Sequence, residues 1–577
     1  MWYSKRSLHW LIGDEEAVEP LRMKMVNGSL RVKKEAILAL GRISKPSATA
    51  LLVNLLRNFN PDIRALAAQS LASTGDSTAA RQCFPLLDDP SPAVLASASY
   101  TIGRLGIGGN EDRLIELLQH KDKRVRLRAA EALGRLKCGK AVKFLKKLTK
   151  DKDRMVRIKA VEALGRIGNA KTADVIGHLL GNKDPYIEVL ALRGIANAKE
   201  KSLFKKVAKL TSSKSPMVRR AALEAVVSTG GMKARDYIIQ SIVHGTPHEA
   251  MTALELLGKL GNKDDINLMA DTLLYGSNTL RREGAAIGIG NYESEKDLEE
   301  KIDIRGKETS AIGALLQCAN DDDWVVASLC VESLAKVGRA DDIARLSEIF
   351  KARNSRVDGD LRLALLDAVH SITGRTKSDT DAKDAVIELY KFSLGDPDPR
   401  VRKKGAGYLI EFGMSANPSP RSIWKRGELP WDSPPLPMGD TTVVIKTQRG
   451  DIKVRLFGDD APGAVFALLD LARRGFYDGL TFHRVVPGFV IQGGDPRDDG
   501  WGDAGFFLRS QFNRHRYLKG TVGLAHAGKD TPGSQFFITQ LPQPHLDGRY
   551  TVIGVVVEGL DVVDRIEEQD TFDIETQ

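Results

Sequence analysis

Apolar residues recur at every third or fourth position through most of the first 413 residues, and the pattern restarts about every 31 residues. This spacing is typical of an amphipathic helix with one buried face. The clearest copies are VRLRAAEALGRL from Val125 and VRIKAVEALGRI from Val156. A second apolar stretch precedes each copy, for example at 112–119 and at 141–148. Each repeat is therefore predicted to form two short helices joined by turns.

Looser copies of the same helix occur throughout this part of the chain. They begin near Val32, Ile63, Val94, Ile187, Val218, Ala250, Arg281, Val326, Arg362 and Val401. One position of the repeat holds a small residue in successive copies, namely Gly41, Ala72, Gly103, Gly134 and Gly165. Small residues at a fixed position allow close approach between neighbouring helices. The pattern predicts roughly a dozen helix pairs stacked as an all-α solenoid, and it resembles short HEAT-like repeats, although its period is below the ~40–47 residues usual for that class.

Two stretches interrupt the repeats. Residues 291–310 are charged and predict an extended loop or a solvated helix. Residues 417–437 contain six of the 23 prolines together with two tryptophans, which favours an extended connector. We therefore divide the chain into a HEAT-like solenoid (1–413), a proline-rich linker (414–439) and a third part (440–577).

The third part has the pattern of a β protein. Residues 441–447 and 452–456 alternate as strands around a turn at 448–450. Residues 462–475 predict a helix that begins at a proline and ends at a glycine. The remaining short strands and glycine turns suit a closed antiparallel barrel.

Three motifs lie in this third part. They read FHRVVPGFVIQGGD from Phe482, GTVGLAHAGKDTPGSQFFIT from Gly520 and HLDGRYTVIGVVV from His545. In this order they resemble the cyclophilins, the peptidyl-prolyl cis-trans isomerases, in the shorter bacterial-type branch, over about residues 441–566. The resemblance implies an eight-stranded closed barrel with two helices over its open ends. It also implies isomerisation of X-Pro bonds in protein substrates, with no metal and no cofactor.

The chemistry of the reaction points to particular residue types. Rotation about a peptide bond is opposed by a barrier of about 18–20 kcal/mol, and a catalyst must bind the twisted amide better than either planar form. Arg484 is the candidate cationic donor to the proline nitrogen, and with Phe489 and Gln492 it forms the candidate catalytic set. The candidate substrate-binding residues are Val490, Ala525, His526, Gln535, Phe537, His545, Leu546 and Tyr550. The resemblance supports these roles at Val490, Ala525, His526, Gln535, Phe537 and Leu546, whereas Tyr550 stands where many members of the family have histidine. His545 stands where many members of the family have tryptophan, which disfavours tight cyclosporin binding.

Composition and charge limit the classes of protein and of partner that fit this chain. With 42% hydrophobic and 28% charged residues the chain is typical of a soluble globular protein. Residues 440–577 carry 15 Lys and Arg against 20 Asp and Glu, a net charge of −5, and the remaining 70 against 55 give +15 to the preceding part. No apolar run approaches the ~18 residues of a membrane span.

The cysteines and the first residues bear on the compartment. Cys83, Cys138, Cys318 and Cys330 form no CxxC pair and no zinc spacing, which predicts free core thiols in a reducing compartment. The first 20 residues lack the long apolar segment of a secretory signal. We therefore expect a cytoplasmic protein, and an exported form with a further leader is the alternative.

Three functions remain open from the sequence. The first is a folding enzyme in which the solenoid binds a protein and the barrel isomerises its X-Pro bonds. The second is a non-catalytic scaffold whose barrel only recognises proline segments. The third is a nucleic-acid-binding array, which the sequence disfavours, because aromatics are sparse and the repeated arginines are predicted to pair with local acids or carbonyls. These arginines include Arg126, Arg157, Arg219 and Arg402.

Overall fold

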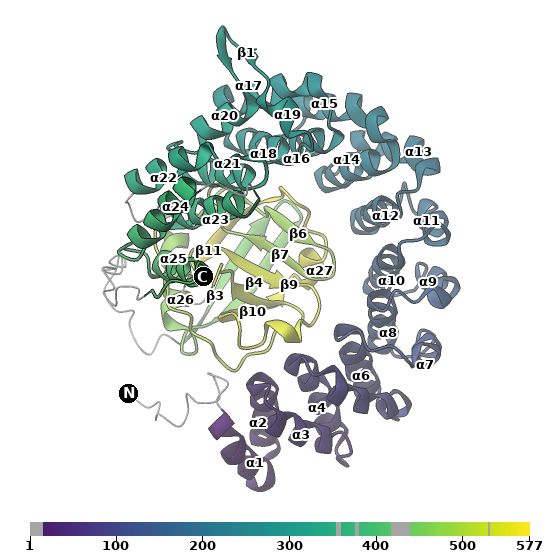
Figure 1. Ribbon diagram of the computed structural model, residues 1–577. Coiled ribbons are helices and arrows are strands. Elements are labelled where there is room, and N and C mark those ends of the chain that lie inside the picture. Colours follow the sequence, from purple (N-terminus) through teal and green to yellow (C-terminus); the bar gives the residue numbers. More distant parts are fainter. Residues whose placement is uncertain (1–14, 354–358, 376–379, 417–438, 529–530, 577) are drawn as a thin grey trace. The chain divides into compact units, whose positions relative to one another are not determined.

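The structure is a computed structural model that describes residues 15–353, 359–375, 380–416, 439–528 and 531–576 (Figure 1). The chain forms two compact units. The first contains Met1–Ala221 together with Ser433–Gln577, and the second contains Ala222–Asp432. Among the described residues, no helix is both long and apolar enough to cross a membrane.

The helical part of the first unit consists of paired helices. They are α1 (Val18–Asn27), α2 (Leu30–Ile43), α3 (Pro46–Leu55), α4 (Pro61–Thr74), α5 (Ser77–Ala80), α6 (Pro92–Arg104), α7 (Glu111–Leu117), α8 (Lys123–Arg135), α9 (Val142–Leu148), α10 (Arg154–Ile167), α11 (Ala170–Gly177), α12 (Pro185–Ala198) and α13 (Phe204–Ala208). Helices α2, α4, α6, α8, α10 and α12 pack in sequence order as one row, and α3, α7, α9 and α11 form a second row (Figure 1). Each predicted repeat start in this part lies in a helix of the first row. The predicted helix pairs are therefore confirmed here.

The repeated arginines stabilise the turns of the solenoid. Arg126 donates from Nη1 to the carbonyl oxygens of His120 and Lys121 at 2.8 and 3.0 Å, and it binds Asp151 through Nε at 2.8 Å. The other three arginines donate in the same way to carbonyls six residues earlier, at Asp151, Ser213 and Asp396. The prediction of local pairing is confirmed. These guanidinium groups are therefore committed to the repeats and do not form an open phosphate-binding stripe.

The small residue of each repeat lies at the contact between successive helices. A Cβ atom on Gly103 would lie 2.5 Å from Cα of Ala132, and one on Gly134 would lie 2.6 Å from Cα of Ala163. Both distances are well inside van der Waals contact. The glycines are therefore required because the helix backbones almost touch.

The second unit continues the paired-helix pattern. After α14 (Pro216–Gly230), which carries the chain from the first unit into the second, the elements are α15 (Arg235–His244), α16 (Pro247–Leu260), α17 (Ile266–Tyr275), α18 (Thr279–Gly290), α19 (Glu295–Glu299), β1 (Ile302–Ile304), β2 (Lys307–Thr309), α20 (Ala311–Cys318), α21 (Trp324–Val337), α22 (Asp342–Ala352), α23 (Gly359–Arg375), α24 (Thr380–Ser393) and α25 (Pro399–Glu411). One continuous apolar core runs through them. The stretch 291–310 differs from the prediction, because it contains α19 and the hairpin β1–β2. The hairpin turns at Arg305 and Gly306, both with positive φ, and Asp303 accepts a hydrogen bond from the Gly306 amide at 3.0 Å.

The rest of the first unit is a nine-stranded antiparallel sheet. Its strands are β3 (Asp440–Thr447), β4 (Gly450–Phe457), β5 (Leu480–Thr481), β6 (Arg484–Val486), β7 (Val490–Gly493), β8 (Thr521–Leu524), β9 (Phe536–Thr539), β10 (Val552–Glu558) and β11 (Thr571–Thr576), and its helices are α26 (Pro462–Arg473) and α27 (Leu560–Val563). The order is β5-β11-β3-β4-β10-β8-β9-β7-β6, with β5 and β6 at the ends. The predicted hairpin and the helix from Pro462 are confirmed. The strand count is nine and not eight, because the chain between Leu480 and Val486 forms two separate strands.

The predicted proline-rich linker, 414–439, lies almost entirely outside the described residues. Only 414–416 and 439 of it are described. The expectation of an extended connector therefore stays a prediction.

Candidate active site

The strand register places Arg484 in a row of residues that crosses four strands. Arg484 on β6 lies opposite Gln492 on β7, Gln492 lies opposite Phe537 on β9, and Phe537 lies opposite Gly523 on β8. Residues directly opposite in an antiparallel sheet project from the same face. A Cβ atom on Gly523 would lie 2.1 Å from the hydroxyl oxygen of Tyr517, so only glycine fits at the end of this row.

Two glutamines connect Arg484 to the loop 500–502. Arg484 donates from Nη1 to Oε1 of Gln492 at 3.1 Å, and Gln492 donates from Nε2 to Oε1 of Gln535 at 2.9 Å. Gln535 donates in turn to the carbonyl oxygens of Gly500 and Gly502 at 2.9 and 2.8 Å. The carbonyl acceptors fix the orientation of the Gln535 amide, and each amide then fixes the next. The guanidinium is therefore held by a relay anchored in the backbone.

An apolar cluster lies beside this row. Its buried members are Val490, Tyr517, Phe537, Leu546 and Val552, and the partly exposed residues packed against it are Phe457, Phe489, Ala525 and Tyr550. Two of the predicted histidines complete the partly exposed rim. His545 stacks on Phe489 with ring centroids 5.7 Å apart, and His526 stacks on Tyr550 at 4.3 Å. The structure therefore brings all eleven candidate residues into one region.

The structure adds residues that the sequence did not single out. Tyr517 stacks on Phe537 with centroids 5.4 Å apart and forms part of the buried cluster. Gln540 is fully buried, and its side-chain Oε1 accepts a hydrogen bond from the backbone N–H of Gly488 at 2.8 Å. The backbone N–H of Gln540 donates to the carbonyl oxygen of Phe489 at 2.9 Å. These two bonds hold the turn that presents Phe489. The glutamine directly follows the second motif, which ends at Thr539, and this position was its only signal in the sequence.

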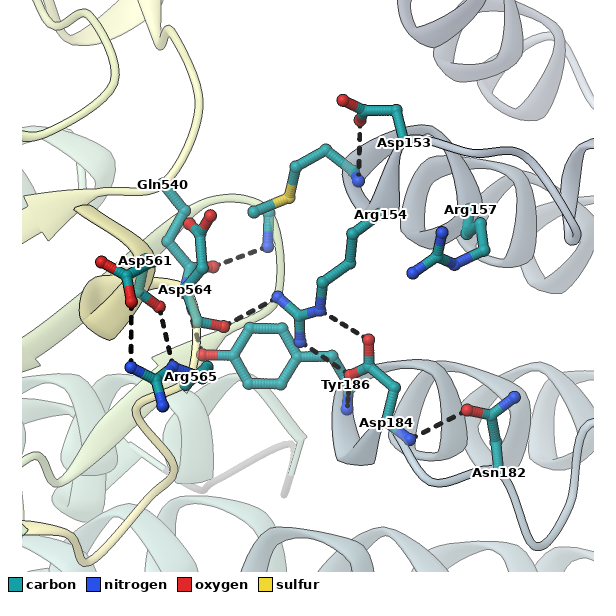
Figure 2. Close-up of polar contacts among 12 residues, drawn as sticks. Asp153, Arg154, Arg157, Asn182, Asp184, Tyr186, Gln540, Asp561, Asp564 and Arg565 are labelled. Carbon is teal, nitrogen blue, oxygen red and sulfur yellow. Dashed lines mark hydrogen bonds and ion pairs between the residues drawn. The ribbon is translucent and has the colours of Figure 1, made fainter. Parts of the chain in front are cut away.

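Solenoid residues contact Gln540 and the segment 564–566 within the first unit (Figure 2). Gln540 donates from Nε2 to the hydroxyl of Tyr186 at 2.9 Å, and this hydroxyl donates to the carbonyl oxygen of Ile566. Arg154 binds Asp184 through two nitrogens and donates from Nη1 to the carbonyl oxygen of Asp564 at 2.7 Å. Helices α10 and α12 are thus joined to the β-sheet part of the unit by buried and half-buried polar contacts.

Arg484 is a cation near neutral pH. Although the residue is exposed to solvent, burial of its guanidinium lowers its pKa, and the neighbouring Tyr550 and Glu568 raise it. A guanidinium with an ordinary pKa above about 12 stays protonated through such shifts. The site therefore holds a permanent cation at the edge of an apolar cluster.

His545 is expected to stay neutral through the whole range near neutral pH. Burial, together with the nearby Arg104, Arg135 and Arg549, lowers its pKa to about 4, although Glu131 acts in the opposite direction. Since the unfolded chain binds a proton near pH 6.5 and the folded chain does not, the free energy of unfolding is highest above that pH and falls as pH drops from about 6.5 toward 4.

The measurement is a pH titration of the histidine ring resonances by NMR on 13C-histidine-labelled full chain, with His545→Gln to assign the signal. We expect the resonance missing from the variant to show no titration between pH 5 and 8. An inflection near pH 6.5 for that resonance would contradict the enclosed, positively charged environment.

Comparisons with known proteins agree with this geometry. The family model "Cyclophilin type peptidyl-prolyl cis-trans isomerase/CLD" matches residues 442–576, and the HEAT repeats model matches 49–113 and 111–188. A peptidyl-prolyl cis-trans isomerase of Synechococcus elongatus is 48% identical over 114 residues, which are 20% of this chain and 79% of the relative. Peptidyl-prolyl cis-trans isomerase B of Bacillus subtilis is 49% identical over 123 residues, 21% of this chain and 86% of the relative. An isomerase of Helicobacter pylori is 46% identical over 133 residues, 22% of this chain and 82% of the relative.

The chain therefore belongs to the cyclophilin-type peptidyl-prolyl cis-trans isomerases. The similarity to these relatives covers about a fifth of the chain, in its C-terminal part, and a HEAT-repeat array precedes it.

Proposed function

We propose that this protein isomerises X-Pro bonds in protein substrates, with Arg484 as the cationic donor and the neighbouring apolar cluster as the proline slot. The observation that carries the proposal is the relay Arg484–Gln492–Gln535 beside Val490 and Phe537. A fixed cation next to an apolar surface is the arrangement that the reaction needs.

The arginine acts on the twisted amide. As the X-Pro bond rotates, the lone pair localises on the proline nitrogen, and a donor held nearby stabilises that state more than either planar form. Because Gln492 already fixes the guanidinium, little reorganisation accompanies the reaction, which is the condition under which such a donor is worth most. Gln492 and Gln535 are positioning residues in this scheme, and no nucleophile or general base is needed.

The apolar residues hold the proline ring. Val490, Phe537 and Leu546 are buried at 2%, 5% and 7% exposure and form the floor of the slot. Phe489, Ala525, His526, His545 and Tyr550 are half-buried and form its rim. When the proline ring is held on this surface, the residue before it can rotate relative to the ring, and the rotation takes place about the X-Pro peptide bond.

We also propose that the sheet closes as an eight-stranded barrel through a bent strand. Only Phe482 and His483 separate β5 from β6, the two end strands. Phe482 donates its amide to the carbonyl oxygen of Asp570 and accepts from the amide of Gln569, which extends the pairing beside β11. Counted as one bent strand, residues 480–486 would link both ends of the sheet and give eight strands.

The domain division 1–413, 414–439 and 440–577 is part of the proposal, with the repeats as a protein-binding scaffold. Stacked helix repeats present a long surface suited to a protein partner. A cytoplasmic location is also proposed, since all four cysteines are free and buried and such thiols persist in reducing compartments.

The test compares the full chain with residues 438–577 on two substrates, a short proline peptide and an unfolded protein whose refolding is limited by prolyl isomerisation. We expect both proteins to accelerate the peptide. The full chain should be at least about tenfold better than the barrel on the protein substrate, because binding to the repeats raises the effective concentration of its proline segments.

Two results would contradict the proposal. Equal acceleration of the protein substrate by both proteins would remove the scaffold role from the repeats. Binding of proline peptides without acceleration by either protein would support the alternative, a non-catalytic reader of proline segments.

A further inference from the structure

The loop 542–549, which carries His545 and Leu546, lies against the solenoid of the first unit. Arg128 on α8 donates from Nη2 to the carbonyl oxygen of Pro542 at 2.9 Å. Arg516, next to the buried Tyr517, donates to Oε1 of Gln69 on α4 at 3.0 Å. A Cβ atom on Gly548 would lie 2.5 Å from the guanidinium carbon of Arg42 on α2. Helices α2 and α8 therefore contact this loop, and α4 contacts Arg516, which itself donates to Asp547 in the loop.

Helix α6 lies between α4 and α8 in this row and contributes Tyr100 and Arg104. Tyr100 follows Gln69 by one repeat of 31 residues, so the two occupy the same face of successive helices. Arg104 precedes Arg135 by the same spacing. The guanidinium of Arg128 lies over the ring of Tyr100, 4.8 Å from its centroid. The repeat geometry thus gathers three arginines around one tyrosine.

The charges of this group do not balance. Its one carboxylate, Glu131, binds Arg128 at 2.6 Å and Arg135 at 3.1 Å. Among the residues that the structure describes, the Arg104 side chain makes no hydrogen bond and no ion pair. Two of the three guanidinium groups therefore bind Glu131, and Arg104 pairs with no carboxylate among the described residues.

The positive charge of these arginines lies beside the proposed proline slot. Arg104 and Arg135 are close enough to His545 to lower its pKa, as Arg549 does from the barrel itself. His545 stacks on Phe489, the candidate catalytic ring, with centroids 5.7 Å apart. A peptide bound in the slot and leaving it over His545 would therefore enter the field of these arginines.

We propose that Arg104, with Arg135 beside it, forms a subsite for an acidic side chain of the substrate, located within a few residues of the proline. The inference rests on the proposed isomerase function and adds a preference that the barrel alone would lack. Partly enclosed arginines bind carboxylates through charge-assisted hydrogen bonds, and Arg104 has donors available for them. A peptide is the expected ligand because the subsite continues a peptide-binding slot.

The test measures kcat/KM of the full chain on a series of proline peptides. Each peptide carries one glutamate at a defined position before or after the X-Pro pair, and its partner carries glutamine there. We expect a Glu-to-Gln preference of about fivefold at one or more positions at low ionic strength, falling toward one at about 0.5 M salt. In Arg104→Ala the preference should fall to about one, and in Arg104→Glu it should reverse in favour of a lysine peptide.

Arg166→Ala is the matched control. Arg166 occupies the same repeat position two copies after Arg104, but it is paired with Glu162 at 2.9 Å and is largely exposed. This variant should keep the wild-type preference. Because each preference is a ratio within one protein, a partial loss of folded material does not change it, and Arg104→Gln provides a closer replacement in shape.

Equal kcat/KM for all Glu and Gln pairs with the wild-type chain would overturn the proposal, as would an undiminished preference in Arg104→Ala. Either result would leave the isomerase function intact, since turnover of the glutamine peptides reports on it separately. Inhibition by an oligonucleotide without any glutamate preference would instead assign these arginines to phosphate binding and also overturn the acidic-peptide subsite.

Discussion

Replacing Arg484 with alanine is expected to lower kcat/KM for a proline peptide by about a hundredfold or more. The change removes the fixed donor and leaves the apolar cluster, so binding of proline should persist while stabilisation of the twisted amide is lost. Removal of one preorganised donor typically costs about 2.7–4 kcal/mol of transition-state stabilisation. The residue is exposed, so its truncation should have little effect on the fold. The measurement is the catalysed cis-to-trans rate together with peptide affinity.

Two further variants separate charge from geometry. Arg484→Lys keeps the cation but loses the planar fork that meets Gln492, and we expect an intermediate loss. Arg474→Ala removes an exposed arginine at the end of α26 that pairs with Asp470, and its activity should stay within about twofold of the wild type. If Arg484→Ala turned over peptide at a nearly normal rate, Arg484 would have no part in the mechanism.

A valine in place of Gly134 is expected to destabilise the first unit by about 3 kcal/mol or more. The new side chain would meet the backbone of Ala163, where even a Cβ atom would lie 2.6 Å from Cα. Backbone cannot move aside as a flexible side chain can, and overpacking of this kind costs about 1–3 kcal/mol for smaller insertions. The midpoint of helix unfolding, followed by circular dichroism, should fall by roughly 5–10 °C.

Gly407 provides the matched control for this prediction. It also lies inside a helix, α25, but a Cβ atom there would meet nothing within 4 Å. Gly407→Ala should therefore leave stability unchanged or raise it by up to about 1 kcal/mol through helix propensity. A Gly134→Val variant as stable as the wild type would mean that the close helix contact is not needed.

Much of the fold could be read from the sequence because its patterns are local. A 31-residue period specifies helix pairs, and the small residue in each copy indicates where the next helix approaches, as at Gly134. The hairpin β3–β4 followed from alternation around one turn. The hairpin β1–β2 was missed because each strand has only three residues: Ile302–Ile304 alternates, but Lys307–Thr309 contains no apolar residue.

The sequence motifs and the chemistry of the reaction identified the candidate residues of the site, but they did not predict how these residues are arranged. The motifs name Arg484, Gln492 and Gln535, yet their spacing of 8 and 43 residues gives no order of hydrogen bonds. The register of β6, β7 and β9 decides that order by placing neighbouring strands in one sheet. Tyr517 was missed for the same reason, since a lone tyrosine before a strand gives no sign of which side it packs on.

The sequence by itself determined the repeating helices, the β-rich third part and the reaction class, because each depends on residues within one helix, hairpin or motif. Only the tertiary structure decided that Tyr186 would meet Gln540 and that Arg104 would approach His545. These partners lie hundreds of residues apart, and no periodicity links a helix of the array to a loop of the β-rich part. Such contacts depend on how two separately folded surfaces fit, which is a property of their shapes and charges in three dimensions.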